Sequence, residues 1–207
     1  RNRVILVTPP DKTGLALPTD RGLLAVFDAM QSKPIAPYQD LASDQPLVAS
    51  TPRGSAIVEE KQTPEIGVRE WKLAYGVRVV LKPTDFKNDE VVMSAWSPGG
   101  TSLASDSLFA PAATAGMGVG QGGVGAFSLV DLQKVLSGKA VSVDPSITPL
   151  SEGFSGQASP RDLETLFQLV YLYFTSPRRD SSAFVALQQQ ADAILANRSA
   201  SPQAAYQ

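Results

Sequence analysis

The sequence predicts an α+β fold, in which a mostly antiparallel sheet has helices packed on one face. From Arg69 onward, strand-like and helix-like segments come in blocks: three strands, two helices, two strands and two helices. Blocks of this kind are typical of α+β domains. Apolar residues make up 43% of the 207 residues, so a sizeable core can form. No apolar run approaches the roughly 18 residues that a membrane span requires.

The N-terminal part of the chain predicts a strand, a helix and a linker. A short apolar run from Arg3 to Val7 precedes two prolines and predicts one strand. Thr19 can cap a helix over residues 20–31, because the apolar side chains of that segment fall on one face. Residues 33–64 contain five prolines and show neither helical nor strand periodicity. They predict a long extended linker.

The second part predicts five strands in one sheet. A Tyr75-Gly76 turn joins the first two. The third strand carries apolar residues on both faces, so we expect it to be central. The predicted strands cover residues 69–74, 77–82, 90–97, 140–147 and 152–158, and helices are expected over 106–115, 128–136, 160–175 and 181–197.

Local signals mark where these helices begin and end. Ser128 followed by Asp131 resembles a capping box, and Gly138 supplies a stop. Ser159, Pro160 and Asp162 provide a cap, a proline in the first turn and an acid at the positive end of the dipole. The next helix is expected to bury Leu163, Leu166, Phe167, Val170, Tyr171 and Phe174. The last one is expected to bury Phe184, Leu187, Ala191, Ile194 and Leu195.

The chain contains no histidine and no cysteine, which restricts the chemistry that it can perform. Catalytic zinc is held mainly by imidazole, thiolate and a few carboxylates, and histidine is the usual general base near neutral pH. There is also no histidine to activate a serine, and no G-x-S-x-G motif. We therefore expect no catalytic residue, metal ligand or cofactor-binding residue in this chain.

Several phrases in the second part resemble a half-unit of the pitrilysin/insulinase zinc peptidases, which carry an inverted H-x-x-E-H zinc motif. They are similar to the opening hairpin of that family, to the end of its third strand and to later strands and helices. The phrases are, in order, 75–83 (YGVRVVLKP), 97–101 (SPGGT), 131–139 (DLQKVLSGK), 152–156 (EGFSG) and 162–171 (DLETLFQLVY) followed by 174–178 (FTSPR). No phrase is specific alone, but their order is.

The resemblance implies a particular place for this chain in a larger protein. An active enzyme of the family joins two halves by a linker; the N-terminal half holds zinc, and the C-terminal half is usually degenerate and closes over the substrate. Residues 1–66 resemble the end of one half plus the Pro-rich linker. Residues 67–207 resemble the first, non-catalytic subdomain of the second half, so we expect a segment truncated at both ends.

The zinc ligands that the resemblance implies are missing here. The H-x-x-E-H motif would fall on the helix after Gly99-Gly100, where residues 108–116 contain neither His nor Glu. The downstream Glu ligand would fall on the last helix, where residues 191–195 contain no Glu. We therefore expect no zinc in this segment and zinc in the other half of the parent protein.

Partners and location follow from the same resemblance and from composition. The expected partners are the catalytic half of the parent chain and a peptide or protein substrate, together with possible self-association of the segment. A net charge of −2 gives no basic surplus for nucleic acid. The resemblance and the lack of cysteine favour a periplasmic location, although the sequence itself leaves the location open.

A glycine cluster between Gly116 and Gly125 is the one candidate substrate-facing segment. Gly118, Gly120 and Gly123 match the G-x-G-x-x-G spacing, but a dinucleotide site requires a preceding strand and the preceding segment predicts a helix. The cluster is therefore expected to be a loop, either a simple connector or one that faces the substrate chamber. The candidate residues are Gly118, Gly120, Gly122 and Gly123.

Other polar clusters have simple structural interpretations. Asp85, Asp89 and Glu90 match no calcium loop and are expected in a solvated turn. The run 178–180 (RRD) is expected at a helix boundary, rather than as a site for substrate carboxylates. Tyr171, Tyr173 and Phe174 follow the helix period and are expected in the core.

Three hypotheses for function remain at this point. The first is a non-catalytic segment that walls the chamber of a two-half zinc metalloendopeptidase and helps to bind the peptide. The second is a degenerate relative that acts as a binding or assembly scaffold without a protease partner. The third is an unrelated α+β domain with accidental likeness.

Overall fold

The computed structural model describes residues 4–10, 14–34 and 45–197. The chain divides into two compact units, Arg1–Asp40 and Leu41–Gln207. Among the described residues, no helix has both the length and the apolar character that crossing a bilayer requires.

The described residues of the first unit form one helix, α1 (Asp20–Ser32). It begins where the sequence predicts, because Thr19 Oγ1 accepts a hydrogen bond of 3.1 Å from the Gly22 N–H. Its apolar face is largely exposed: Leu24 and Phe27 keep 53% and 40% of their surface. The strand predicted for residues 3–7 is wrong over 4–7, which form no regular element; a short apolar run becomes a strand only when another strand pairs with it.

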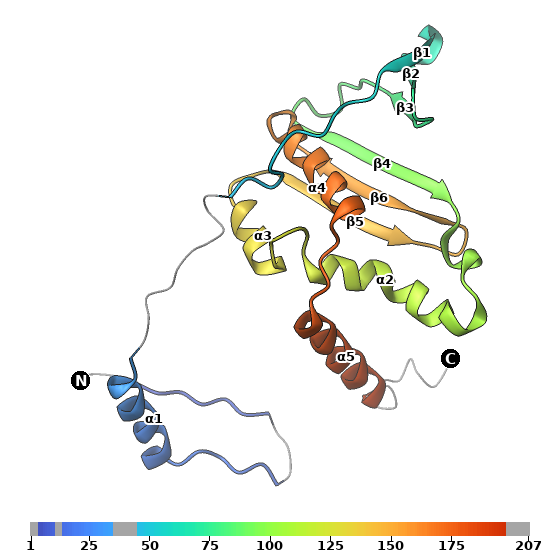
Figure 1. Ribbon diagram of the computed structural model, residues 1–207. Helices are drawn as coiled ribbons and strands as arrows, with labels where there is room; N and C mark the ends of the chain where they lie inside the picture. Colours follow the sequence, from blue (N-terminus) through green and yellow to red (C-terminus); the bar gives the residue numbers. More distant parts are fainter. Residues whose placement is uncertain (1–3, 11–13, 35–44, 198–207) are drawn as a thin grey trace. The chain divides into compact units, whose positions relative to one another are not determined.

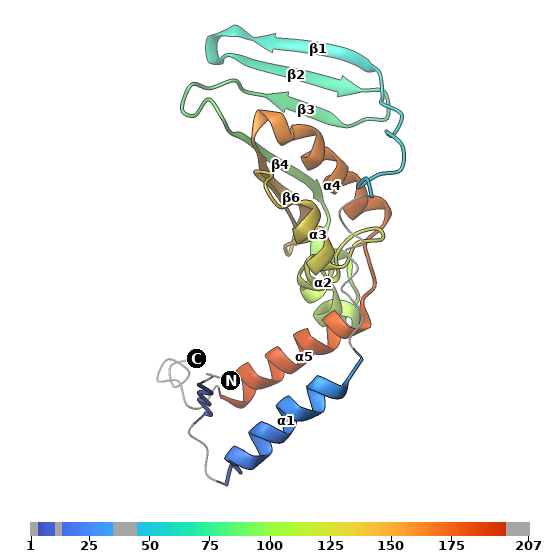
Figure 2. The ribbon, with the colours of Figure 1, turned by 90° about the vertical axis from the view of Figure 1, so that its left-hand side faces the viewer.

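In the second unit, the first three strands form an antiparallel sheet of order β1-β2-β3. These strands are β1 (Ile57–Thr63), β2 (Val68–Leu73) and β3 (Arg78–Leu81) (Figure 2). A short 3-10 turn, Pro64–Ile66, leads into Gly67 and joins β1 to β2. The strand β1 corrects the prediction of an extended linker over residues 33–64, because residues 57–63 form a strand. Pairing with β2 holds this charged segment extended, with Glu60 opposite Trp71 and Gln62 opposite Arg69.

The other three strands form a second antiparallel sheet of order β4-β6-β5. They are β4 (Val91–Pro98), β5 (Val141–Ile147) and β6 (Ser151–Ala158). The prediction of a single sheet is therefore wrong, although the predicted strands themselves are present. The strand β4 is an edge strand of this sheet, not a central one. Apolar residues on both faces of a strand therefore do not show that the strand is paired on both sides.

The core lies between one face of this second sheet and the helix α4 (Leu163–Thr175), which crosses it (Figure 1). In the buried face, Met93 lies opposite Gly156, and Gly156 opposite Val143. Leu166 and Leu169 of α4 are 0% and 2% exposed. The buried apolar residues are Val124, Phe127, Leu132, Val143, Phe154, Ala158, Leu166, Leu169 and Leu172, and Leu47 and Val48 pack against them.

The buried face of α4 is only partly the one that the sequence predicts. Leu166 is buried as expected, but Phe167, Tyr171 and Phe174 are 57%, 41% and 70% exposed. Leu169 and Leu172 are buried instead. Because α4 is apolar on most of its circumference, its period alone does not decide which side faces the sheet. Phe174 still contacts the core at its edge, with its ring centroid 4.8 Å from that of Phe154.

The glycine cluster is helical, which corrects the prediction of a loop. After two 3-10 turns, Gly100–Leu103 and Asp106–Leu108, the helix α2 (Phe109–Gly122) includes Gly118, Gly120 and Gly122. Gly123 follows it with a φ of +82°. The helix α2 packs along β5 and against the last helix. This packing stabilises α2 as a helix although its glycines have a low helix propensity.

The glycines of α2 differ in what surrounds them, which gives a testable contrast. A Cβ at Gly118 or Gly120 would meet nothing within 4 Å, whereas a Cβ at Gly122 would lie 2.4 Å from the Arg178 carbonyl oxygen. We expect Gly118→Ala and Gly120→Ala each to stabilise the protein by about 0.5–1 kcal/mol. We expect Gly122→Ala to destabilise it by about 1–3 kcal/mol. Urea unfolding of the three variants tests this, and equal shifts of one sign would contradict it.

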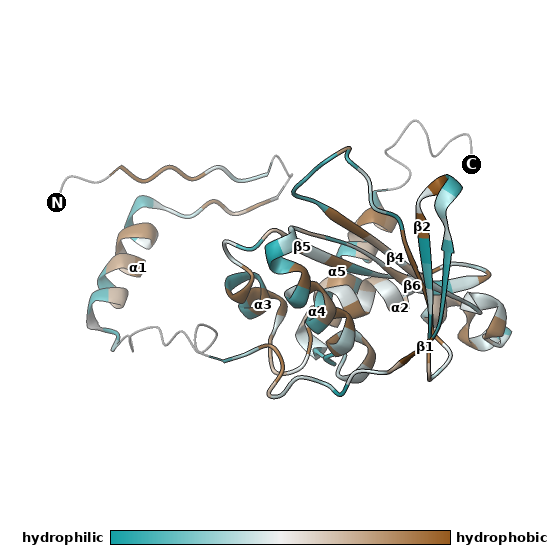
Figure 3. Cartoon of the chain, turned by 90° about the horizontal axis from the view of Figure 1, so that it is seen from above, coloured by the Kyte–Doolittle hydropathy of each residue, from teal (hydrophilic) through white to brown (hydrophobic). Residues whose placement is uncertain are grey.

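The remaining helices are α3 (Leu129–Val135) and α5 (Ser181–Ala196). In Figures 1 and 2, α5 lies beyond α2 as seen from the second sheet, and it packs against α2. Of the residues expected to face inward, Phe184, Ile194 and Leu195 are 56%, 65% and 64% exposed and Ala191 is exposed too, so the prediction is wrong for these four and holds only for Leu187. Only Ala183 and Leu187 of this helix are half-buried. Figure 3, coloured by hydropathy, shows apolar residues in both α3 and α5. The fold is α+β with antiparallel sheets, as predicted.

Candidate functional site

The two segments at which the resemblance places zinc ligands lie on helices that contact each other. Residues 109–116 form the first half of α2, and residues 191–195 lie on α5. The first segment contains neither His nor Glu, and the second contains no Glu. Over residues 4–10, 14–34 and 45–197, no three His, Cys, Asp or Glu side chains form a group that could hold a metal ion.

The approach to α2 is built on the Ser-Pro-Gly-Gly-Thr phrase after β4. The Gly100 N–H donates to Glu152 Oε2 at 3.0 Å, and the Thr101 N–H donates to the Thr148 carbonyl at 3.0 Å. Gly100 has a φ of +68°, and a Cβ there would lie 2.1 Å from the Thr148 carbonyl oxygen. Glycine is therefore required on both counts. These hydrogen bonds fix the 3-10 turn Gly100–Leu103, which precedes α2, to the β5–β6 hairpin.

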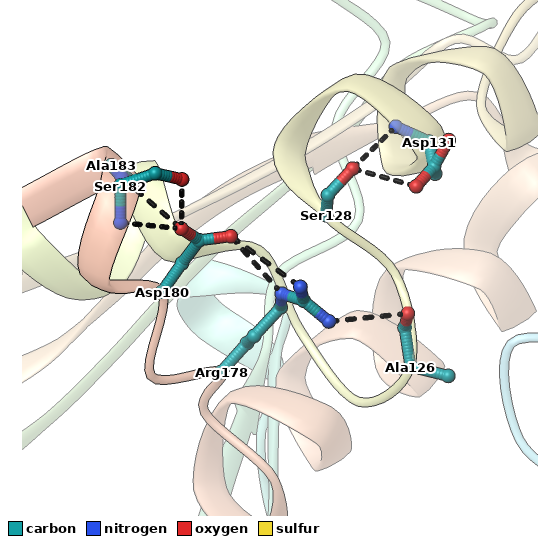
Figure 4. A network of polar contacts seen from close by, with 7 residues as sticks. All are labelled: Ala126, Ser128, Asp131, Arg178, Asp180, Ser182 and Ala183. Atoms are coloured by element: carbon teal, nitrogen blue, oxygen red, sulfur yellow. Dashed lines mark hydrogen bonds and ion pairs between the residues drawn. The ribbon is translucent and has the colours of Figure 1, made fainter. Parts of the chain in front are cut away.

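A network of polar contacts joins the loop before α3 to the start of α5 (Figure 4). Asp180 caps α5: its Oδ1 accepts hydrogen bonds from the N–H groups of Ser182 at 3.0 Å and Ala183 at 3.1 Å. The Arg178 guanidinium lies 3.4 Å from the other carboxylate oxygen and donates to the Ala126 carbonyl at 3.5 Å. The boundary expected at residues 178–180 is thus present. Arg178 is occupied by these contacts.

The start of α3 in the same view is capped as predicted. The Asp131 N–H donates to Ser128 Oγ at 3.2 Å, and Ser128 Oγ–H donates back to the Asp131 carboxylate at 2.6 Å. Another pair of the same kind precedes α4, where Ser159 bonds Asp162 and the Asp162 carboxylate also accepts the Ala140 N–H at 3.0 Å. These acids stabilise the starts of the helices that they cap.

The cap of α5 makes stability depend on pH. Hydrogen bonds from the Ser182 hydroxyl and then from the Ala183 N–H lower the pKa of Asp180 from 3.8 to about 2. Between these values the unfolded chain binds more protons than the folded one, so stability falls as pH drops from about 4 to 2. Asp180→Asn keeps a capping side chain but removes this titration. We expect the variant to show a shallower loss of stability over that range in urea unfolding. Identical pH profiles would contradict the assignment.

One open pocket lies where α2, α3 and α5 meet. It has a volume of about 400 Å³, and its lining combines Leu129, Ala183 and Leu187 with the polar Gln121 and Gln190. Asp180 and Ser128 also border it, but both are engaged as caps. The Ser182 hydroxyl in this lining donates to the Asp180 carboxylate at 2.5 Å, and the lowered pKa of Asp180 makes that carboxylate a poor base for activating a hydroxyl. The pocket can accommodate a side chain.

The remaining candidate residues are spread over the domain. Gly118 and Gly120 are half-buried in α2, Gly122 is buried against the loop before α5, and Gly123 is buried beside the Phe127 carbonyl. Gly118, Gly120 and Gly122 are helical and so do not form the predicted loop. That these glycines face a substrate remains a prediction. Asp85 and Asp89 are exposed, and Glu90 pairs with Lys87 at 3.0 Å. The contact of Glu152 with the Gly100 N–H was not predicted from the sequence, in which Glu152 figured only as the first residue of a predicted strand and of the phrase 152–156.

The fold resembles that of solved proteases. No family model matches the chain. The structure superimposes with a TM-score of 0.68 on the periplasmic protease PqqL from Escherichia coli, at 19% identity over 89% of this chain. It superimposes with a TM-score of 0.67 on the ferredoxin protease FusC, solved as a mutant in complex with Arabidopsis ferredoxin, at 21% identity over 92% of this chain.

A similarity in sequence agrees with the similarity in fold. A protein of Arabidopsis thaliana described as a zinc protease PQQL-like is 27% identical over 146 residues, which cover 70% of this chain. The chain spans 13% of that relative and 20% and 21% of the two solved chains. The resemblance to the pitrilysin/insulinase zinc peptidases is thus confirmed, and the chain is similar to a part of each of these three proteases.

Proposed function

We propose that this chain is a non-catalytic segment of a two-half zinc metalloendopeptidase. In this proposal it walls the reaction chamber and helps to bind the peptide, while the other half holds zinc and carries out proteolysis. The partner is therefore the catalytic half of the same parent protein, and the substrate is a peptide or protein.

One observation supports the proposal: the two helices on which the resemblance would place zinc ligands are present and contact each other, whereas the ligand residues are missing from them. The helix α2 follows Gly99-Gly100, where the resemblance would place the zinc motif, and it packs against α5, where the resemblance would place the downstream Glu ligand. The positions at which ligands would lie contain alanine, threonine, isoleucine and leucine, among others. A domain can lose its catalytic residues and keep its fold, because activity depends on the site and not on the fold. A fold kept in this way can still form part of a chamber wall.

The division of labour follows from the available side chains. Zinc activates water and polarises the scissile carbonyl, which requires three protein ligands and an open position. The described side chains of this chain supply carboxylates, of which Asp162 and Asp180 are committed to helix caps. What it can offer to a substrate is backbone hydrogen bonds and apolar surface, which hold a peptide in an extended form.

Hydrolysis of a quenched fluorescent peptide tests the proposal. We expect no chelator-sensitive cleavage by this chain alone, and chelator-sensitive cleavage by the complete protein that contains it. Chelator-sensitive cleavage by the chain alone would contradict the proposal. A complete protein that binds peptides without cleaving them would instead indicate a scaffold, the second hypothesis.

A further inference from the structure

The last part of α2 is helical although its sequence disfavours a helix. Every second residue from 116 to 122 is a glycine. Glycine has a low helix propensity, because its backbone loses more conformational freedom on folding than that of any other residue. Residues two apart in a helix do not share a face, whereas residues four apart do. These glycines therefore fall on two opposite sides of α2 and form no single packing stripe.

The four glycines differ in whether packing requires them. A Cβ on Gly116 would lie 3.4 Å from a backbone oxygen of β5, and a Cβ on Gly122 would lie 2.4 Å from the Arg178 carbonyl oxygen. At Gly118 and Gly120 a Cβ would meet no described atom within 4 Å. Packing thus accounts for glycine at the two ends of the run but not in its middle. Natural proteins break local sequence rules mostly at functional or strained sites.

Side chains hold the middle of this run weakly. Between residues 117 and 121, only Val119 has a large apolar side chain that is half-buried; Met117 is 58% exposed, and Gln121 is exposed too. On both sides the chain is fixed, since Gly116 packs on β5 and Val124 is fully buried. A segment with few buried apolar contacts opens at a low free energy. Such a segment can open while its two fixed ends stay in place.

We propose that residues 117–121 open and refold locally in the native protein, and that they form an adjustable wall of the pocket between α2, α3 and α5. Gln121 lines this pocket on the α2 side, and Leu187 lines it on α5. Opening of the segment gives the pocket more room than its volume of about 400 Å³. A wall that repacks lets one pocket accept side chains of different sizes. The inference concerns this chain alone and goes beyond the proposed function.

Hydrogen exchange of the full chain, followed by mass spectrometry at several low urea concentrations, tests the opening. We expect amides of residues 117–121 to exchange at least about tenfold faster than those around Leu166 and Leu169, which are buried in α4. Their rate should change little with urea, because a local opening exposes little surface. Gly118→Ala and Gly120→Ala should each slow it about two- to fivefold. Exchange of the segment with the rate and urea dependence of α4 would overturn the proposal.

Thiol labelling tests whether the opening enlarges the pocket. The chain has no cysteine, so Leu187→Cys places a single thiol in the pocket lining. The thiol is labelled with iodoacetamide, which is small, and with a maleimide dye that is larger than the pocket. Both rates are measured again after Gly118→Ala and Gly120→Ala are added together. Gly22→Ala, the same change in α1, is the control, and circular dichroism verifies that each variant is folded.

We expect the paired alanines to slow labelling by the dye about fivefold or more, and to leave labelling by iodoacetamide unchanged. Gly22→Ala should change neither rate. A dye rate that the paired alanines leave unchanged would overturn the proposal, because access to the pocket would then not depend on α2. Equal slowing of both reagents would overturn it as well, since the alanines would then have reduced access to the pocket in general and not its enlargement.

Discussion

Leu166→Asp is expected to unfold the second unit. Leu166 is fully buried between α4 and the second sheet. Removing its side chain costs about 2–5 kcal/mol, and a carboxylate without a partner in an apolar core adds several more. Together these costs approach the roughly 5–15 kcal/mol of stability that a typical domain has. Near-ultraviolet circular dichroism and urea unfolding should show a loss of the cooperative transition.

The neighbouring residue provides the control for this prediction. Phe167 is 57% exposed, so Phe167→Asp should shift stability by no more than about 0.5 kcal/mol. The pair also tests which face of α4 is buried. Retention of cooperative unfolding by Leu166→Asp, or loss of it by Phe167→Asp, would show that the helix packs by a different face.

Gly153→Ala is expected to break the pairing of β6 with β4. A Cβ at this position would lie 2.0 Å from the Ala95 carbonyl oxygen and 2.9 Å from the Trp96 Cα. These are backbone atoms, so the strands themselves must separate. Overpacking of this kind costs about 1–3 kcal/mol and sometimes more, and we expect the upper end of that range because no side chain can rotate away.

A second glycine on β6, Gly156, provides a comparison for the destabilisation expected from Gly153→Ala. A Cβ at Gly156 would lie 3.1 Å from the Ser142 carbonyl oxygen and 3.3 Å from the Met93 Cε, of which the methionine end is flexible. Gly156→Ala should therefore destabilise the protein less than Gly153→Ala does. Urea midpoints of the two variants give the comparison, and the reverse order would contradict the packing described for β4 and β6.

Local signals in the sequence predicted the starts of the helices well. Thr19, Ser128 and Ser159 all cap the helices or turns that they precede, because a cap depends only on residues a few positions away. The order of strands and helices from residue 68 onward was also predictable, and so was the resemblance to the protease family. The order of elements and the resemblance both follow from short sequence segments that this chain contains.

Features decided by distant contacts were not predictable. Residues 57–63 look like a charged linker until β2 pairs with them, and residues 116–122 look like a loop until β5 and α5 pack beside them. The apolar circumference of α4 did not reveal that Leu169 would be buried and Phe167 exposed. For the candidate site, the absence of zinc ligands from residues 108–116 and 191–195 could be read directly, whereas the contact between α2 and α5 could not.

Zinc stoichiometry tests the central claim most directly. The chain, purified without a histidine tag, is incubated with zinc, dialysed and measured by elemental analysis. Because it has no imidazole or thiolate and zinc sites in proteins are built mainly from these groups, we predict no stoichiometric zinc. One tightly held zinc ion per chain would contradict the account, since the segment would then carry a metal site of its own.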